Sequence, residues 1–449
     1  MLRFSFTDLK LNVEKEVFMN TRQLKKLVCD AIDNNRDKII AIGESIFHEP
    51  ELGYKEFKTA EKVKNFFSEL GLDYRDGVAL TGVIASLPGK ERKLNVAVMG
   101  ELDAVVCPNH PFADSDTGAA HSCGHFIQIA VMLGVALALK ESGVMEYLCG
   151  DVSFMAVPAE EAVELEWRKE MIESGRISCL GGKQEFITQG VFDNVDVLLM
   201  QHSATNSDKM TTGGPSAMGF VAKIIQYIGK ECHAGSPYKG INALDAARIG
   251  LTASDALRST FREEDGIKFH PIITRGGDLV NVVPGFVQLE AYVRGRSNEA
   301  ILDASSRIDR ALKAGADALG AECKIFNIPG YMTPVESELL KSIAQSNMVE
   351  LVGEEGVEIS PDQCTTDAND VSNIIPVLHA SIGGVKGRAH SLDYEVSDPE
   401  LAYIKAAKML AMTVVDLLSD GAQRGIEVKE TYNAPLTKES YIDLLNSAK

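Results

Sequence analysis

The sequence predicts an α/β fold with a smaller α/β domain inserted into it. Helical periodicity alternates with short apolar runs typical of buried strands, and three of these runs are followed by ionisable residues. In the middle of the chain the order changes to β-α-β-β-α-β, the split βαβ pattern of a compact domain. We therefore expect a main domain formed by residues 1–212 and 330–449 and an inserted domain at residues 213–329.

The composition is that of an ordinary globular protein. The chain has 449 residues, of which 45% are hydrophobic and 24% are charged, enough to form a sizeable core. Its net charge of −19 disfavours nucleic acids and anionic membranes as partners. Residues 1–18 lack a continuous apolar core, so we expect no secretory signal, and no stretch is apolar enough to span a membrane. The eight cysteines are scattered singly, which is typical of reduced cytoplasmic thiols.

The elements of the main domain follow from periodicity. Residues 21–47 predict one long amphipathic helix, and residues 55–70 predict a second helix that ends at Gly71. Four apolar runs are short enough to be buried strands: 83–87, 94–99, 151–157 and 195–200. The other expected elements of this domain are helices at 126–139, 166–173, 338–351, 399–418 and 439–446, and a strand at 376–382.

The inserted domain has its own alternation of elements. Its strands are expected at 217–228, 269–274, 287–293 and 322–328, and its helices at 243–257 and 300–319. Neither domain contains a phosphate-binding glycine loop or a Gly-x-Ser-x-Gly elbow. This argues against nucleotide use and against a serine hydrolase.

The segment His121-Ser122-Cys123-Gly124-His125 places one thiol and two imidazoles within five residues. We expect it at the N-terminus of a helix, where unpaired N–H groups and the helix dipole favour a thiolate. Cys123 and His125 can then face one metal ion, since Gly124 permits the backbone to turn. The alternative is a buried thiol beside a hydrogen-bonded histidine, and His121 is the weaker ligand candidate.

Further candidate ligands follow other strands. Glu160 and Glu161 are adjacent, and because successive side chains point apart, one carboxylate can bind metal while the other faces a water molecule. The alternative for this pair is a solvated acidic loop. His202 closes an apolar strand and His390 follows a glycine-rich turn, so thiol, imidazole and carboxylate together form a two-metal set. Four other histidines lack such settings, and we treat them as ordinary: His48, His110, His270 and His379.

Three residues of the inserted domain are candidates for contact with a substrate. His233 cannot lie near the other candidates unless this domain folds over the site or a second subunit supplies the histidine. Asn281 and Arg294 are candidates for binding a carboxylate, which arginine can hold with two parallel hydrogen bonds. The alternatives are a turn asparagine and a surface arginine.

Taken together, these motifs resemble the di-metal amidohydrolase and peptidase family of aminoacylases, hippurate hydrolase and carboxypeptidase G. Within that family they look like the aminobenzoyl-glutamate hydrolase and auxin-conjugate hydrolase branch. The landmarks occur in the order Glu-Leu-Asp-Ala, Cys-Gly-His, Pro-Ala-Glu-Glu, Gln-His, Cys-His-Ala-Gly-x-Pro, Asn-Val-Val-Pro and a late histidine, over residues 48–390. The resemblance implies a zinc-peptidase-like α/β catalytic domain with an inserted ferredoxin-like lid and dimerisation domain.

The resemblance also implies a role for each matched residue. The ligands of two divalent metal ions, Zn or Mn with Co or Ni as alternatives, would be Cys123 as the bridge, His125, Glu161, His202 and His390. Glu160 would be the general base, and Asp103, in the motif that begins at Glu101, would stand behind the ligands. The lid residues would be His233 at the developing oxyanion, with Asn281 and Arg294 at the free carboxylate of the substrate.

The chain departs from the family pattern in three places. Phe126 stands where an aspartate is usual after His125. The late motif around His390 reads Ala-His-Ser rather than His-His-Pro. The segment after Glu161 is lengthened around residues 167–190, which should reshape the pocket.

The predicted activity is metal-dependent hydrolysis of the amide bond of a small N-acyl amino acid or dipeptide-like substrate, of aminobenzoyl-glutamate or aminoacylase type. A water that bridges the metals would attack, with Glu160 as its base. The predicted assembly is a cytoplasmic homodimer through the lid domain, or a hetero-oligomer, with no nucleic-acid or membrane partner. The alternative is a non-catalytic or partner-dependent subunit of the same fold with an incomplete metal site. A zinc deaminase would need a Cys-x-x-Cys pair, which the sequence lacks.

Overall fold

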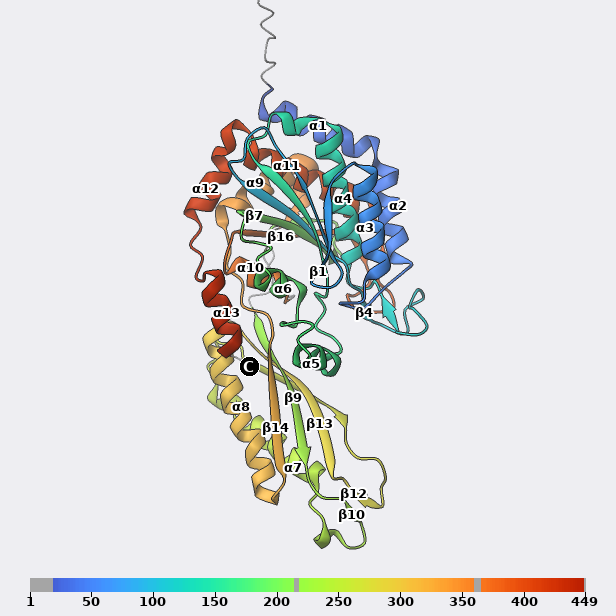
Figure 1. Ribbon diagram of the computed structural model, residues 1–449, viewed down its shortest axis with the longest axis vertical. Coiled ribbons are helices and arrows are strands. Elements are labelled where there is room, and N and C mark those ends of the chain that lie inside the picture. The colour runs from blue at the N-terminus through green and yellow to red at the C-terminus, as the bar shows by residue number, and fades with distance from the viewer. Residues whose placement is uncertain (1–18, 214–217, 359–364, 448–449) are drawn as a thin grey trace, which may run out of the picture.

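The structure is a computed structural model that describes residues 19–213, 218–358 and 365–447 (Figure 1). A larger α/β part contains the main sheet, and a smaller, elongated part extends from one end of it. Residues 1–18, where we expect no secretory signal, lie outside the described residues. So does residue 217, where we expect a strand to begin. The division of the chain at residues 213 and 330 stays a prediction.

Within the described residues the main sheet has nine strands, in the order β1-β2-β6-β3-β7-β16-β8-β15, with β17 paired to β16. Neighbours β6 and β3, β3 and β7, and β7 and β16 are parallel. The strands are β1 (Tyr74–Val78), β2 (Gly82–Leu87), β3 (Asn95–Glu101), β6 (Asp151–Val157), β7 (Val197–Thr205), β8 (Met210–Thr211), β15 (Val357–Glu358), β16 (Val377–Lys386) and β17 (Glu395–Val396). Since parallel strands end at one edge, the segments that follow β3, β6 and β7 meet there.

Helices cover both faces of this sheet. Alternate residues of β3 belong to different cores, with Val96 and Val98 in one and Ala97 and Met99 in the other. The first core contains α1 (Thr21–Asn34), α2 (Arg36–Phe47), α3 (Phe57–Glu69), α4 (His125–Glu141), α9 (Glu338–Val352), α11 (Ala406–Leu418) and α12 (Gln423–Thr431). The second contains α5 (Leu165–Glu173), α6 (Gly182–Thr188), α10 (Ala368–Ser372) and α13 (Lys438–Ser447). Within the described residues, every helix is too short or too polar to traverse a membrane.

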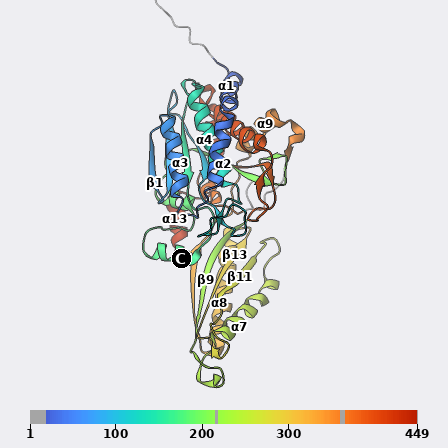
Figure 2. The ribbon, with the colours of Figure 1, turned by 90° about the vertical axis from the view of Figure 1, so that its right-hand side faces the viewer.

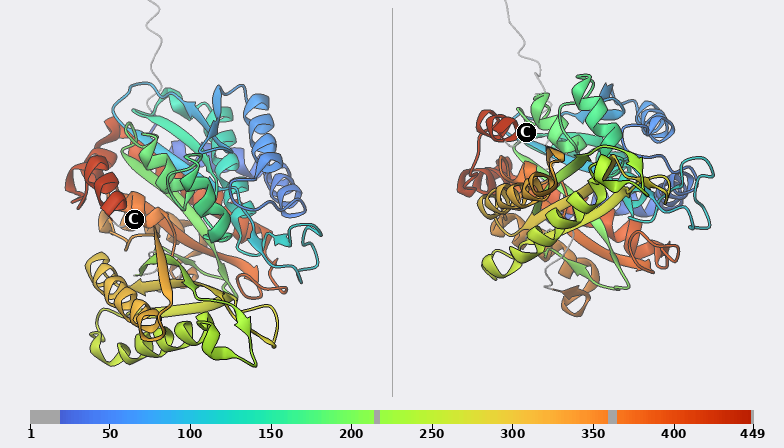
Figure 3. Two further views of the ribbon diagram at one scale, coloured as in Figure 1. Left: turned by 60° about the horizontal axis from the view of Figure 1, so that its bottom comes forward. Right: turned by 90° about the horizontal axis from the view of Figure 1, so that it is seen from below.

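The smaller part is an antiparallel sheet in the order β11-β13-β9-β14. Its elements along the chain are β9 (Gly219–Ile228), α7 (Ala243–Ala256), β11 (Lys268–Arg275), β13 (Phe286–Gly295), α8 (Asn298–Leu319) and β14 (Glu322–Pro329). This is the predicted ferredoxin-like βαββαβ order, with both helices side by side on one face of the sheet (Figures 2 and 3). The two helices approach closely where Gly315 meets Gly250. A side chain on Gly315 would collide with the backbone of Gly250.

Two short ribbons complete the strands. One pairs β4 (Val105–Val106) with β5 (Ala119–Ala120) beside the main sheet. The other pairs β10 (Cys232–His233) with β12 (Val282–Val283). Figure 1 shows β10 and β12 at the end of the smaller part that is farthest from the main sheet.

Three of the expected elements have a different form in the structure. The single helix expected at 21–47 is broken at Asn35, whose side chain donates to the carbonyl of Ala31 and whose backbone is not helical. Strand β7 runs on to Thr205, because β16 also continues and pairs with it, so His202 lies within the strand rather than after it. A π-helical turn, Glu400–Lys405, precedes α11 where one continuous helix was expected.

Candidate metal centre

Five predicted metal ligands converge at the edge of the main sheet. Sγ of Cys123 lies 3.4 Å from Nε2 of His202 and 3.3 Å from Nε2 of His390. The ligand atoms of two triplets each lie within 4.8 Å of one another: Cys123 with His125 and His202, and Cys123 with Glu161 and His390. Because Cys123 belongs to both triplets, its sulfur is placed to bridge two ions.

A glycine makes the turn that brings Cys123 and His125 together. Gly124 caps α4 in the left-handed region, at φ 104°, which glycine adopts without strain. A side chain there would collide with the hydroxyls of Ser203 and Tyr394. The expected position of the cluster at a helix N-terminus is therefore confirmed, with His125 as the first residue of α4.

The two adjacent glutamates point at different histidines. Oε1 of Glu161 lies 2.9 Å from Nε2 of His390, while Oε2 of Glu160 lies 3.9 Å from Nε2 of His125. Both glutamates are buried, which excludes the solvated acidic loop. The pair is thus arranged with one carboxylate as a ligand candidate in the Cys123 triplet and the other beside it.

The backbone of these glutamates is held by three side chains from other elements. The hydroxyl of Tyr331 donates to the carbonyl of Glu160, and Nη2 of Arg168 donates to that of Glu161 at 2.5 Å. The hydroxyl of Tyr292, on β13, donates to the carbonyl of the next residue at 2.5 Å. Arg168 is fully buried. Tyr292, on β13 of the smaller part, therefore helps to hold the segment that follows both glutamates.

Asp103 orients two of the candidate ligands from behind. Nδ1 of His125 lies 2.9 Å from the backbone carbonyl of Asp103, to which it donates as the protonated ring nitrogen. The backbone N–H of Glu161 donates to Oδ2 of Asp103 at 2.8 Å. This arrangement leaves Nε2 of His125 directed at the centre, as a metal-binding histidine requires.

Burial and neighbouring charges shift the pKa values of the two adjacent glutamates in opposite directions. Burial raises the pKa of Glu160 well above its usual range, and the carboxylates of Glu101 and Glu161 raise it further. Burial acts in the same sense on Glu161, but the hydrogen bond and charge of His390 prevail and lower its pKa to about 2. Burial, with the charge of Glu161, raises the pKa of the Cys123 thiol, so the expectation of a thiolate from the helix N-terminus alone is wrong. A coordinated cation deprotonates such a thiol.

The donor set fits divalent cations. Among the described residues, Nε2 of His125 is buried without a hydrogen bond of standard geometry. Thiolate, imidazole and carboxylate together suit Zn or a similar transition metal. Seven buried carboxyl groups lie in or next to the site: Glu56, Glu101, Asp103, Glu160, Glu161, Asp367 and Asp370. They outnumber the buried cationic side chains there, Arg168 and Lys183, and bound cations would stabilise their ionised form.

The centre opens into a cavity of about 790 Å³ between the two parts of the molecule. Cys123, Glu160 and His390 form part of its wall, and Arg294 reaches it from β13. The guanidinium of Arg294 lies 5.4 Å from the ring centre of Tyr292. Arg294 is therefore placed where a substrate anion could be bound.

Two predicted lid residues lie elsewhere. His233 is exposed on β10, and its Nδ1 accepts a hydrogen bond from the N–H of Gly235 at 2.9 Å. Asn281 is exposed beside it, and its carbonyl accepts from Ala234. The structure brings these two residues together but not to the metal centre of the same chain, because β10 and β12 lie at the far end of the smaller part (Figure 1).

The site also contains residues that the sequence reasoning missed. His379, treated as ordinary, lines the cavity, and its ring stacks on that of His202 with centroids 6.1 Å apart. Arg168 and Lys183 come from α5 and α6 of the lengthened segment. Their burial could not be expected from the sequence, because a positively charged residue outside any predicted strand is normally exposed. Phe126, in contrast, packs in the core against Phe47, so a hydrophobic contact replaces the usual aspartate.

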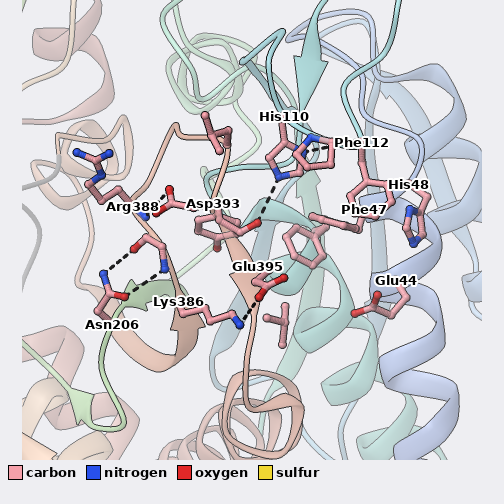
Figure 4. Close-up of a pocket in the computed structure, with 16 residues that line it drawn as sticks. Glu44, Phe47, His48, His110, Phe112, Asn206, Lys386, Arg388, Asp393 and Glu395 are labelled. Atoms are coloured by element: carbon pink, nitrogen blue, oxygen red, sulfur yellow. Dashed lines mark hydrogen bonds and ion pairs between the residues drawn. The ribbon is translucent and has the colours of Figure 1, made fainter.

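A second cavity, of about 740 Å³, is lined in part by residues that precede and follow His390 in the chain, among them Arg388 and Asp393 (Figure 4). Its wall includes Phe47, His48, His110 and Phe112, whose rings are in edge contact, and the charged residue Arg388 (Figure 4). Nε2 of His110 is within hydrogen-bonding distance, 3.3 Å, of the carbonyl of Tyr394. This position agrees with the expectation that His48 and His110 are ordinary histidines, because the wall of this cavity contains none of the candidate metal ligands.

Comparisons with known proteins agree with this geometry. Residues 97–416 match the model of Peptidase family M20/M25/M40. The chain is 26% identical to the Xaa-Arg dipeptidase of Mus musculus, over 95% of each chain. It is 26% identical to the IAA-amino acid hydrolase ILR1-like 4 of Arabidopsis thaliana, over 82% of this chain and 83% of the relative. Its fold resembles that of the Bacillus subtilis YXEP protein, described as a dinuclear metal binding peptidase. The TM-score is 0.64 at 21% identity, over 86% of this chain and 99% of the other.

Proposed function

The chain belongs to peptidase family M20/M25/M40, and from this membership we propose that it hydrolyses the amide bond of a small N-acyl amino acid or dipeptide-like substrate. It is a metal-dependent hydrolase of this family, which acts on amino-acid conjugates or acyl amino acids. The observation that carries the proposal is the pair of triplets that share Cys123 at the wall of a cavity. The two relatives named above are a dipeptidase and an amino-acid-conjugate hydrolase, which supports a substrate of this class.

In this proposal the ligands are Cys123, His125, Glu161, His202 and His390. The bound cations would polarise the scissile carbonyl and acidify the attacking water. Glu160 takes the proton of that water and delivers it to the leaving amine. Burial and the carboxylates of Glu101 and Glu161 raise the pKa of Glu160, which favours uptake of this proton.

The substrate carboxylate is assigned to Arg294, which can hold it with two hydrogen bonds. Because His233 and Asn281 are exposed far from the metal centre, we assign them to the cavity of a second subunit in a homodimer that forms through the smaller part. A hydrogen-bond donor at the developing oxyanion contributes roughly 3–4 kcal/mol in comparable sites. We further propose that the enzyme works in the cytoplasm.

The test is a screen of the purified protein against N-acyl amino acids, aminobenzoyl-glutamate and dipeptides, with Zn or Mn added. We expect turnover of at least one of these substrates, its loss in the presence of a chelator, and its recovery when metal is restored. A chain that binds less than one equivalent of metal and hydrolyses nothing in the panel would instead be a non-catalytic subunit of this fold.

The assignment of His233 has a separate test. His233→Ala and Glu160→Gln are each expected to be inactive alone. If His233 acts across the dimer, a mixed dimer of the two variants contains one complete site and recovers part of the activity. Failure of the mixed dimer to recover activity would place His233 outside the reaction or within its own subunit.

A further inference from the structure

Glu101, the last residue of β3, directs its carboxylate at the imidazole of His125. Oε2 of Glu101 lies 3.0 Å from Nε2 of His125, and neither side chain is more than 1% exposed. Ligand atoms of Glu101, His125 and Glu160 lie within 4.8 Å of one another. Among the described residues they form a third group of side chains that could hold a metal ion, beside the two groups that share Cys123.

The geometry of this contact fits a shared cation better than a hydrogen bond. Among the described residues, Nε2 of His125 has no hydrogen bond of standard geometry although the ring is fully buried. Its other ring nitrogen, Nδ1, is occupied by the carbonyl of Asp103. Two donor atoms about 2.1 Å from one ion, in tetrahedral or octahedral geometry, lie roughly 3.0–3.4 Å apart. The separation of 3.0 Å between Glu101 and His125 falls in this range.

Glu101 is fixed in place by other buried side chains. Nζ of Lys183, on α6, lies 2.5 Å from Oε1 of Glu101 and 2.5 Å from Oδ1 of Asp367, and the backbone N–H of Lys183 also donates to Asp367 at 2.9 Å. Nε2 of Gln128, on α4, donates to Oε2 of Glu101 at 2.6 Å. Elements distant in sequence thus hold one carboxylate in a single position.

The charges of these buried side chains also favour a cation next to Glu101. Lys183, Glu101 and Asp367 are all at most 1% exposed, and one ammonium between two carboxylates leaves one buried negative charge. Burying an uncompensated charge is costly, so such a group is expected to face a cation. The side of Glu101 that is turned away from Lys183 faces His125.

We propose that Glu101 supplies an oxygen ligand to the cation that His125 binds, and that Lys183 is the positioning residue that holds Glu101 there. The proposal rests on the proposed function, because it adds one ligand to the metal centre of that site. It gives a role to the glutamate that stands in this chain at the first acidic position of the strand-end motif, and to a lysine from the lengthened segment.

The test is a calorimetric titration of the metal-stripped protein with Zn²⁺. The visible absorption spectrum of the Co²⁺-loaded protein provides a second measurement. We expect the unaltered chain to bind two equivalents. Glu101→Gln should lose at least about 100-fold in affinity for one of them and shift the Co²⁺ spectrum. Lys183→Met should weaken the same equivalent by about 10–100-fold, the range for residues that orient a ligand, and Lys183→Arg should recover most of it.

A buried carboxylate away from the centre provides the matched control. Glu185, also on α6, accepts hydrogen bonds from the backbone of Cys179 and the side chain of Ser178, and Glu185→Gln should leave both equivalents unchanged. Thermal unfolding of each variant shows whether it is folded. If Glu101→Gln does not fold, Glu101→Asp keeps the charge, withdraws the oxygen by one methylene, and should weaken the same equivalent.

Two results would overturn the inference, and they are distinguishable. If a folded Glu101→Gln variant binds both equivalents with unaltered affinity and an unaltered Co²⁺ spectrum, Glu101 is not a ligand and the proposed function stands. If the unaltered chain binds less than one equivalent and hydrolyses nothing in the panel, the proposed function fails and the inference fails with it.

Discussion

Replacing Glu160 by glutamine should abolish proton transfer while leaving the metal centre in place. The amide keeps the volume of the side chain but cannot accept the proton of the attacking water. The carbonyl of Glu160 remains fixed by Tyr331 and the backbone of Glu161 by Arg168, so the neighbouring ligand should not move. The expected defect is therefore confined to the chemical step.

The size of the defect follows from the role assigned to the carboxylate. A positioned general base contributes roughly 10²–10⁴-fold to the rate, or about 3–5 kcal/mol of barrier. The same change removes the buried carboxyl group of Glu160, whose pKa is raised by burial and by the charges of Glu101 and Glu161. Metal-stripped Glu160→Gln should therefore be at least as stable as the unaltered chain, which separates loss of activity from loss of folding.

The assay combines kcat for the best substrate of the screen, metal content by mass spectrometry and thermal unfolding without metal. Glu170→Gln is the matched control, because Glu170 is exposed on α5 ten residues along and should tolerate the same change. Retention of more than about a tenth of kcat by a metal-loaded Glu160→Gln variant would refute the assignment of the base.

Three other expectations follow from particular contacts. Phe126→Ala should lower the free energy of unfolding by about 3–5 kcal/mol in denaturant titrations, because the ring is fully buried, whereas a surface-like change below 1 kcal/mol would contradict its place in the core. Burial, with the charge of Asp103, raises the pKa of Glu56 to about 8, so the folded state holds this proton more tightly than the unfolded state and stability falls as pH rises from about 4.5 to 8. Glu56→Gln should remove this loss, of at most about 1.4 kcal/mol per pH unit, and equal pH dependence of both proteins would contradict it. Tyr331→Phe should leave a carbonyl unpaired, at a cost of about 1–3 kcal/mol, and lower kcat more than it changes KM; unchanged kcat would show that this tyrosine does not position the base.

The convergence of the candidate ligands could be predicted from the sequence, because most of these residues lie at the ends of regular elements. Cys123 and His125 flank a glycine at the start of an apolar helix, and Glu160 and Glu161 follow a buried strand. Such positions lie at one edge of an α/β sheet whatever the details of packing. The ferredoxin-like order of the smaller part could be read in the same way, from alternating elements.

Contacts that depend on tertiary packing could not be read from the sequence. The burial of Lys183 requires both Glu101 and Asp367, which are separated from it by 82 and 184 residues. His379 reaches the cavity because β16 lies beside β7, and no local sequence pattern predicts this pairing. The direction of the shift in the pKa of Cys123 could not be read from the sequence either, because the helix N-terminus is local but burial and the charge of Glu161 are not.

X-ray absorption spectroscopy of the zinc-loaded protein tests the central claim, that the sulfur of Cys123 is shared by two cations, most directly. We expect a zinc–sulfur distance of about 2.3 Å and a second zinc roughly 3.5–4 Å away, with the sulfur signal lost in Cys123→Ser. A spectrum of the unaltered protein with only nitrogen and oxygen neighbours, and no second metal, would contradict the account.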